Sequence, residues 1–246
     1  MRCYIPPTDW LLGEVRLTPE ESHHLTHVLR AREGQTVMVF DGQGRVGEAE
    51  VLQARSKSGA LVQLRNEKAV PRPRVRLQLV QALIRGSKMD LIVQKATELG
   101  VAVIAPVETE RAVVRCRPGK EEDRVRRWWT VAVNAAKQCG TPWLPELLAP
   151  VSLEERVAQD AGADLALLCS LAPGVKPLRD VLRGADLGST GRIDIYVGPE
   201  GDFTDAELSA ITSAGATPVS LGNLTLRAET AALFAISAVS YELSGI

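Results

Sequence analysis

The rhythm of the sequence changes at Val70-Pro-Arg-Pro-Arg74, and this change most constrains the fold. Each proline disfavours the helical conformation in the residue before it, so a stiff, extended connector is expected there. Before the connector, short apolar runs alternate with turn residues. After it, strand-like runs alternate with helical ones. We therefore expect two domains, residues 1–72 and residues 73–246.

Residues 1–72 have the pattern of a small β-barrel-like domain. Apolar and β-branched runs are separated by turn residues such as Asp41-Gly-Gln-Gly44. A helix is expected over residues 20–30, because Thr18 can cap it and Pro19 suits its first turn. The expected strands cover residues 35–40, 46–53 and 60–64.

Residues 73–246 predict a mostly parallel α/β sheet, because short strands alternate with helices. The last helix is apolar on nearly every face, so it should be buried against the sheet or a partner subunit. The expected strands cover residues 75–84, 101–107, 164–170, 192–198 and 217–221. The expected helices cover residues 87–100, 121–138, 204–215 and 227–243, the third opening with the capping box Thr204-Asp-Ala-Glu207.

The composition is that of a globular protein, with 45% hydrophobic and 24% charged residues, which excludes a disordered chain. The apolar runs fall short of the roughly 18 residues that a membrane span needs, and the N-terminus has no apolar signal region. Cys3, Cys116, Cys139 and Cys169 form no C-x-x-C pair, so neither a zinc ribbon nor a disulfide framework is expected. We expect a cytoplasmic protein with reduced thiols and no membrane contact.

Charge is distributed unevenly along the chain. Residues 1–140 hold 23 Lys and Arg against 16 Asp and Glu, whereas residues 141–246 hold 6 against 14. A basic first part beside an acidic second part suggests a polyanion that is contacted mainly from one side. The alternative is an ordinary solvated surface.

Three loops that follow expected strands are the candidates for chemistry: residues 170–174, 198–202 and 222–230. Ligands of parallel sheets bind outside the carboxyl ends of the strands. Glycine and proline in these loops let backbone groups approach a ligand closely. None of the loops is a dinucleotide-binding or Walker sequence, and each taken alone is also typical of a plain turn.

Several motifs accompany these loops in order along nearly the whole chain. They are His24-Leu-Thr-His-Val-Leu-Arg30, Lys88-Met-Asp90, Gln94-Lys-Ala-Thr-Glu-Leu-Gly100, Glu110-Arg111, Ala135-Ala-Lys-Gln138, Gly198-Pro-Glu-Gly201, Leu221-Gly222 and Leu226-Arg-Ala-Glu-Thr-Ala231. In these motifs the chain resembles the small-subunit ribosomal RNA uridine-N3 methyltransferase family, a branch of the SPOUT class. It departs from the family at Asp202, where a glycine is usual, at Cys139-Gly-Thr-Pro142 and at Asn223-Leu-Thr225.

The resemblance implies a PUA-like RNA-binding barrel over residues 1–72 and a trefoil-knotted SPOUT methyltransferase domain over residues 73–246. It also implies S-adenosylmethionine as methyl donor, small-subunit (16S) ribosomal RNA or the 30S particle as partner, and a homodimer. With the three loops, it points to a donor site at Leu171, Gly198, Pro199, Glu200, Gly201, Leu221, Gly222, Leu226 and Thr230.

Methylation of uridine N3 sets the chemistry required of the site. N3 carries an imide proton, and negative charge spreads onto O2 and O4 as that proton leaves, so the site needs a proton acceptor and fixed donors. Arg227 is the candidate for orienting the uracil and stabilising this charge; alternatively it anchors a phosphate or pairs with Glu229. Glu229 is the candidate proton acceptor, directly or through water, and alternatively favours the first turn of the last helix.

Basic residues are the candidates for RNA contacts, because they supply phosphate affinity, although each is also typical of a solvated surface. The candidates are Arg2, His24, Arg30, Arg32, Lys88 and Arg111. His23 and His27 share a helix face, but no glutamate of an H-E-x-x-H motif and no third ligand accompany them, so no metal site is expected. Trp128 and Trp129 suit base stacking, although at least one should be core.

An RNA methyltransferase specific for uridine N3 is therefore the leading interpretation. One alternative is a related methyltransferase that acts on another RNA position. The other is a non-catalytic, dimeric RNA-binding protein whose C-terminal half only dimerises. Binding of S-adenosylmethionine would distinguish the two methyltransferase interpretations from the non-catalytic RNA-binding protein.

Overall fold

A computed structural model describes residues 2–10, 13–56, 58–116, 119–160, 162–188 and 191–243. The chain divides into two compact units, which are described separately. The first unit comprises Met1–Arg72 together with Val133–Leu144, and the second comprises Pro73–Ala132 together with Pro145–Ile246. The sequence pattern does not predict that Val133–Leu144 belongs to the first unit, because its helical periodicity continues that of the preceding residues.

The first unit is built on a five-stranded sheet in the order β1-β3-β4-β5-β2. β1 pairs with β3 in parallel, and the other pairs are antiparallel. The strands are β1 Arg2–Tyr4, β2 Glu14–Arg16, β3 Thr36–Phe40, β4 Arg45–Gln53 and β5 Leu61–Ala69. Alternate residues such as Val37, Val39 and Val51 enter a core that is closed to solvent. The three strands expected from the sequence are present, while the three-residue strands β1 and β2 were missed.

The helix expected over residues 20–30 is present in two parts. Thr18 caps α1 (Pro19–His23), and its hydroxyl accepts a hydrogen bond from the Glu21 amide. A wider π-helical turn, η2 (His24–Val28), then continues the chain. The helical path ends at Arg30, which has a positive φ of 52°. A short 3-10 turn, η1 (Pro7–Asp9), precedes α1.

A buried ion pair ties the segment Val133–Leu144 to the first unit. Lys137 Nζ lies 2.6 Å from Glu21 Oε1, with 9% and 6% of the two side chains exposed. The other oxygen of Glu21 accepts a hydrogen bond from the Tyr4 amide at 3.0 Å. Val133 and Ala136 pack with Tyr4 and Phe40 in a small apolar cluster. Apolar burial and a satisfied charge pair therefore explain why this segment belongs with the sheet.

The second unit is an α/β structure on an eight-stranded sheet in the order β11-β13-β10-β12-β6-β7-β8, with β9 also on β7. Every pairing of its described strands is parallel. The strands are β6 Arg76–Ala82, β7 Val103–Glu108, β8 Glu146–Leu147, β9 Val151–Ser152, β10 Leu165–Cys169, β11 Lys176–Pro177, β12 Arg192–Val197 and β13 Thr217–Ser220. The parallel sheet and its five principal strands agree with the sequence pattern, which missed the two-residue strands β8, β9 and β11.

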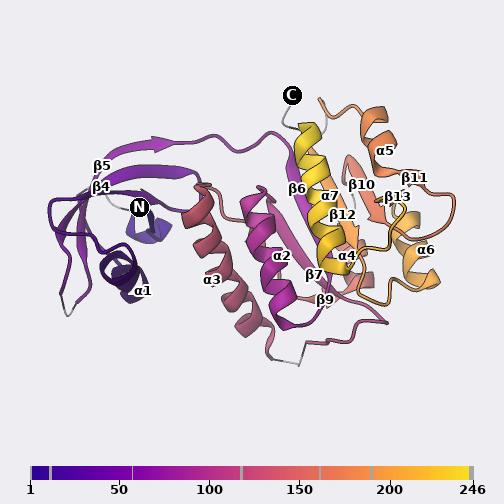
Figure 1. Ribbon diagram of the computed structural model, residues 1–246, viewed down its shortest axis with the longest axis horizontal. Coiled ribbons are helices and arrows are strands. Elements are labelled where there is room, and N and C mark those ends of the chain that lie inside the picture. The colour runs from indigo at the N-terminus through magenta and orange to yellow at the C-terminus, as the bar shows by residue number, and fades with distance from the viewer. Residues whose placement is uncertain are drawn as a thin grey trace. The chain divides into compact units, whose positions relative to one another are not determined.

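Helices cover the second sheet, and α2 and α7 lie side by side over it (Figure 1). Leu153 of α4 and Ile211 of α6 pack on the face formed by residues such as Val80 and Leu168. The helices of this unit are α2 Gly86–Glu98, α4 Leu153–Gln159, α5 Leu178–Gly184, α6 Asp205–Ser213 and α7 Ala228–Leu243. Helix α3 (Glu121–Cys139) begins in the second unit and ends in the segment Val133–Leu144 of the first. The capping box of Thr204 and Glu207 is formed at the start of α6, as the sequence predicts. The short helices α4 and α5 were missed.

Helix α7 presents one buried and one exposed face, rather than burial on every side. Ala232, Ala235, Ile236 and Val239 are closed to solvent, whereas the Phe234 side chain is 49% exposed. A helix that is apolar all round and only half covered leaves an apolar face open. The sequence pattern predicts burial of this helix against the sheet or a partner subunit, and α7 does pack on β6 and β12 of the sheet.

Candidate functional site

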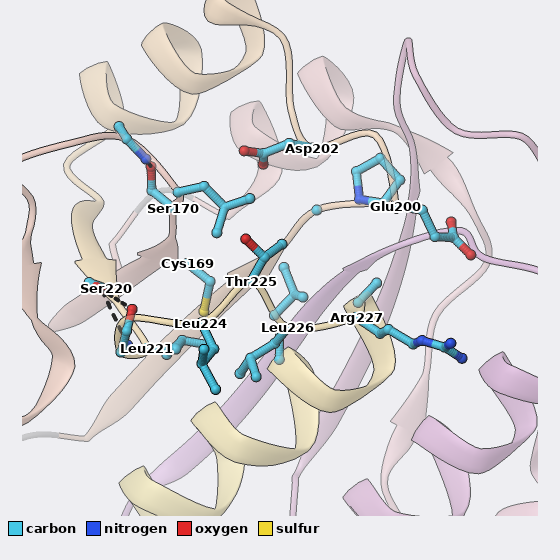
Figure 2. Close-up of a pocket in the computed structure, with 18 of the residues that line it drawn as sticks. Cys169, Ser170, Glu200, Asp202, Ser220, Leu221, Leu224, Thr225, Leu226 and Arg227 are labelled. Atoms are coloured by element: carbon cyan, nitrogen blue, oxygen red, sulfur yellow. Dashed lines mark hydrogen bonds between the residues drawn. The ribbon is translucent and has the colours of Figure 1, made fainter.

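Three loops of the second unit meet around a cavity of about 420 Å³. The loops follow β10, β12 and β13, which are neighbours in the parallel sheet with β10 in the middle. Their carboxyl ends therefore face one edge, where ligands of such sheets bind. Figure 2 shows Cys169 and Ser170 from the first loop, Glu200 and Asp202 from the second, and Leu221 to Arg227 from the third. These are the three loops that the sequence singles out.

Most of the predicted donor residues line this cavity. They are Leu171, Gly198, Pro199, Glu200, Leu221, Gly222 and Leu226, together with the predicted catalytic Arg227. Gly201, Thr230 and Glu229 are not among the lining residues. Some lining residues lie within the three predicted loops but were not predicted to contact the donor: Ser170, Ala172, Asp202, Asn223, Leu224, Thr225 and Ala228. Four more lie one or two residues outside these loops: Cys169, Val197, Ser220 and Ala231.

The second loop is closely packed, which explains its glycines. A Cβ atom on Gly198 would lie 3.2 Å from both Asp202 Oδ1 and the Phe203 ring. Asp202 adopts a positive φ of 59°, and its amide donates to the Pro199 carbonyl at 3.0 Å. Its Oδ1 accepts a hydrogen bond from the Phe203 amide at 2.8 Å. Asp202 thus occupies a left-handed conformation that suits glycine, and its side chain accepts a hydrogen bond from the next amide there.

Arg111 fixes the far side of the second loop. Its Nη1 donates to the carbonyl oxygens of Gly201 at 3.3 Å and Phe203 at 3.2 Å. A Cβ atom on Gly201 would lie 3.2 Å from the Arg111 Cβ. Gly201 therefore contacts Arg111 rather than the cavity, and Arg111, a predicted RNA contact, uses two of its donors within the protein.

The third loop bends at Gly222, whose φ of 128° is one that side-chain-bearing residues rarely adopt. The Ser220 hydroxyl accepts a hydrogen bond from the Gly222 amide at 3.2 Å and donates to the Gly222 carbonyl at 3.1 Å (Figure 2). The bend turns Leu221, Leu224 and Leu226 toward the cavity (Figure 2). Backbone geometry therefore sets the apolar wall of the site.

Charged side chains gather at one side of the cavity. Glu200 and Arg227 extend to the same side in the close-up (Figure 2). Lys88, a predicted RNA contact, lies with its Nζ 3.2 Å from Glu200 Oε1 and 3.3 Å from Glu229 Oε2. The structure thus brings Lys88, Glu200 and Glu229 together. No sequence signal connected them, because Lys88 and Glu200 are 112 residues apart.

Cys169 is the one thiol on the cavity wall among the described residues. Burial raises the pKa of this thiol to about 12. It therefore stays protonated at neutral pH and is not an activated nucleophile. The site suits transfer of a group between two bound molecules better than covalent catalysis by the protein.

Two hollows of the first unit collect four predicted RNA contacts. Arg2 and His24 line one hollow with Leu29, Met38, Asn134, Lys137 and Gln138. Arg30 and Arg32 line the other with Thr26, His27, Glu33 and Arg55 among its residues. Burial, with a smaller effect of the Lys137 ammonium, lowers the pKa of His24. The neutral form of the His24 imidazole is therefore favoured at pH 7.

The structure also describes the histidine pair and the two tryptophans that the sequence analysis considered. His23 and His27 stack with ring centroids 4.3 Å apart, and no cluster of three or more metal-ligating side chains occurs in the described part of the chain. Trp128 is 4% exposed and belongs to the core, whereas Trp129 is 39% exposed. None of the helices that the structure describes is long and apolar enough to cross a bilayer.

The fold and the site define a class, the RNA methyltransferases that carry a PUA domain. Residues 71–240 match the family described as RNA methyltransferase domain, and residues 17–65 match the RNA methyltransferase PUA domain. A ribosomal RNA small subunit methyltransferase E from Synechocystis is 32% identical over 97% of this chain and 77% of its own length. The Bacillus subtilis protein of that name is 29% identical over 92% and 89%, respectively.

Solved structures agree with the sequence comparisons. A ribosomal RNA small subunit methyltransferase E from Neisseria gonorrhoeae, bound to S-adenosyl methionine, is 30% identical with a TM-score of 0.83 over 98% of this chain and 96% of its own. A methyltransferase from Legionella pneumophila in complex with SAM is 32% identical, with a TM-score of 0.88 over the same shares. The chain belongs to the ribosomal RNA small subunit methyltransferase E family. The predicted family, enzyme class and SPOUT-type α/β fold with a PUA-like domain are thereby confirmed.

Proposed function

We propose that this protein transfers the methyl group of S-adenosylmethionine to N3 of a uridine in small-subunit (16S) ribosomal RNA. The observation that carries the proposal is the cavity at the three strand-end loops, with Glu200 and Arg227 on one side. Family membership and two relatives of known structure that bind the same donor support it.

The residues that line the cavity fit S-adenosylmethionine. Leu171, Leu221, Leu224 and Leu226 offer an apolar wall for an adenine ring. The loop backbone, which lines the cavity at Gly198 and Gly222, offers hydrogen-bonding groups at close approach. Carboxylates at Glu200 and Asp202 suit a donor with a positive sulfonium and a positive amino group. When bound, the donor supplies an electrophilic methyl group.

The protein's own residues then orient the uracil and take its proton. Arg227 donates hydrogen bonds to a uracil carbonyl and stabilises the negative charge that develops there. A carboxylate accepts the N3 proton, directly or through water. Glu229, the acceptor predicted from the sequence, and Glu200 are the two carboxylates beside Lys88 at this side of the site.

The first unit supplies RNA affinity in this proposal. Arg30 and Arg32 lie in one of its hollows, and Arg2 and His24 in the other. Lys88 and Arg111 are the RNA contacts predicted in the second unit, and both are already engaged by protein groups. The substrate is ribosomal RNA or the assembled 30S particle, which places the reaction in the cytoplasm.

We also infer a homodimer, with the trefoil knot of the SPOUT class at the donor loops. The open apolar face of α7 at Phe234 supports the dimer, as do the Leu171 and Leu224 side chains, which are 61% and 79% exposed beside the cavity. A second copy that covers these side chains would bury apolar surface next to the donor site. Sedimentation velocity tests this directly and should give twice the chain mass.

The function is tested by mapping methylated bases in ribosomes from a strain that lacks this protein. Loss of one N3-methyluridine, restored by the wild-type protein, supports the proposal. Restoration of a modified base at another position identifies a related RNA methyltransferase instead. If calorimetry detects no S-adenosylmethionine binding, with or without RNA, the protein is a binding scaffold.

A further inference from the structure

Lys88 joins two carboxylates from distant parts of the second unit. It lies in the first turn of α2, whereas Glu200 follows β12 and Glu229 lies in the first turn of α7. Its ammonium is 3.2 Å from Glu200 Oε1 and 3.3 Å from Glu229 Oε2. One cation therefore links the cavity wall to the helix that follows the third loop.

The two carboxylates differ in their access to the cavity. The Glu229 side chain is 13% exposed, and its Oε2 is closed to solvent and accepts no hydrogen bond. The 3.3 Å contact with Lys88 is thus an ion pair without hydrogen-bond geometry, and it compensates a carboxylate that burial would otherwise penalise. The Glu200 side chain is 34% exposed and lines the cavity, whereas Glu229 is not one of the lining residues. Only Glu200 can meet a substrate there.

Arg227 extends to the same side of the cavity as Glu200, outside ion-pair distance of it, and the other charges described next are paired with other groups or exposed to solvent. On α2, Asp90 pairs with Arg127. Arg111, which follows β7, donates to two carbonyl oxygens of the second loop. Asp202 accepts from the Phe203 amide. From α5, which contacts α7, Arg179 pairs with Asp180 and Arg183 is exposed to solvent.

On α2, Lys95 pairs with Glu98, and further charges lie on β6 and β12, against which α7 also packs. Arg76, Arg192 and Asp194 stand at the beginnings of these strands, at the opposite edge of the sheet from Glu200. Across the described residues, Lys88 is the only cation within ion-pair distance of either Glu200 or Glu229.

We propose that Glu200 is the catalytic residue that accepts the N3 proton, and that Lys88, anchored by Glu229, is a positioning residue that holds the Glu200 carboxylate in place at the cavity. The inference rests on the proposed function. The N3 proton moves to a Glu200 carboxylate oxygen, and the N3 electron pair forms the bond to the methyl carbon. The electrons of the broken carbon–sulfur bond stay on sulfur, and Glu200 later gives its proton to water. Glu229, predicted as the acceptor, is the anchor in this arrangement.

The test is the pH dependence of single-turnover methylation, with labelled S-adenosylmethionine and wild-type substrate RNA. In Lys88→Met, two carboxylates face each other without the cation, so the acid limb of the profile should move up by about one pH unit. Turnover should recover at high pH, which a merely structural defect would not allow. Lys88→Arg should keep the limb near its wild-type position.

Two further variants separate the acceptor from the anchor. Glu200→Gln should lower turnover at every pH by about 100-fold or more and remove the acid limb. Glu229→Gln should keep an acid limb, with turnover reduced only several-fold, because the acceptor is still present. S-adenosylmethionine affinity, measured by calorimetry, should change less than about threefold in the Lys88 variants, because Lys88 does not line the cavity.

Lys95→Met is the matched control, because Lys95 lies on the same helix and pairs with Glu98 away from the cavity. It should leave the profile unchanged. The proposal is wrong if the acid limb disappears in Glu229→Gln but not in Glu200→Gln, or if it does not move in Lys88→Met. An unmoved limb together with weaker, less salt-dependent RNA binding would make Lys88 a phosphate contact. Failure of the proposed function itself would look different, since the wild-type protein would then form no N3-methyluridine.

Discussion

The cavity of the second unit and the two hollows of the first unit are built in different ways. The cavity is shaped by three loops whose backbone bends at positions such as Gly222 and whose close packing needs Gly198. The hollows are surfaces that carry long basic side chains, Arg30 and Arg32 among them. A backbone-built cavity depends on a few glycines, whereas a basic surface spreads its affinity over many side chains. The two regions should therefore respond differently to mutation.

The largest effect on donor binding is expected from Gly198→Val. The added side chain would collide with Asp202 Oδ1 and the Phe203 ring, and the second loop would have to move. Calorimetry should show S-adenosylmethionine affinity reduced by about 100-fold or more. Gly184→Ala is the control, because no heavy atom lies within 4 Å of its added Cβ. Unchanged donor affinity in Gly198→Val would show that the donor binds outside these loops.

In the first unit, Lys137→Met should strongly lower the free energy of unfolding. It would leave Glu21 buried with only the Tyr4 amide as partner, at a cost of about 3–5 kcal/mol in unfolding free energy. Urea denaturation measures this loss. Arg65→Ala, which removes an exposed ion pair with Glu50, should change stability by less than about 1 kcal/mol. Equal losses would mean that the Lys137–Glu21 pair is not structural.

Arg227→Ala tests the division between binding and chemistry within the cavity. Turnover should fall by about 100-fold to 1000-fold, because the group that stabilises developing charge on the uracil is gone. S-adenosylmethionine affinity should change only a few-fold, because the loops and the apolar wall remain. Single-turnover kinetics and calorimetry measure the two effects. A large loss of donor affinity with normal turnover would assign Arg227 to donor binding.

The smallest effect is expected from the double variant Arg30→Ala and Arg32→Ala. RNA affinity should fall several-fold, and the slope of log affinity against log salt should become shallower by up to about two. Filter binding across a salt series measures both quantities, with Arg65→Ala as control. An unchanged slope would mean that this hollow does not hold RNA phosphates.

Local signals in the sequence predicted much of this architecture. The Thr204–Glu207 capping box, the Thr18 cap and the five long strands of the parallel sheet each depend on neighbouring residues. The three loops were found because the carboxyl ends of parallel strands share an edge. The strands β1 and β2 were missed because three residues carry too little pattern.

Long-range contacts could not be predicted from local patterns. Lys88 reaches Glu200 across 112 residues, and Lys137 reaches Glu21 across 116 residues. Neither partner choice follows from periodicity, because it depends on which elements pack together in the folded chain. The sequence therefore found the loops of the site but not the ion pairs that connect their charged side chains.

The most direct test of the account is a crystal structure of this protein with bound S-adenosylmethionine. We expect the adenine to lie against Leu221, Leu224 and Leu226, with the methyl group facing the side of the cavity where Glu200 and Arg227 extend. Density for the donor at any other place, or an empty cavity at saturating donor, would contradict it.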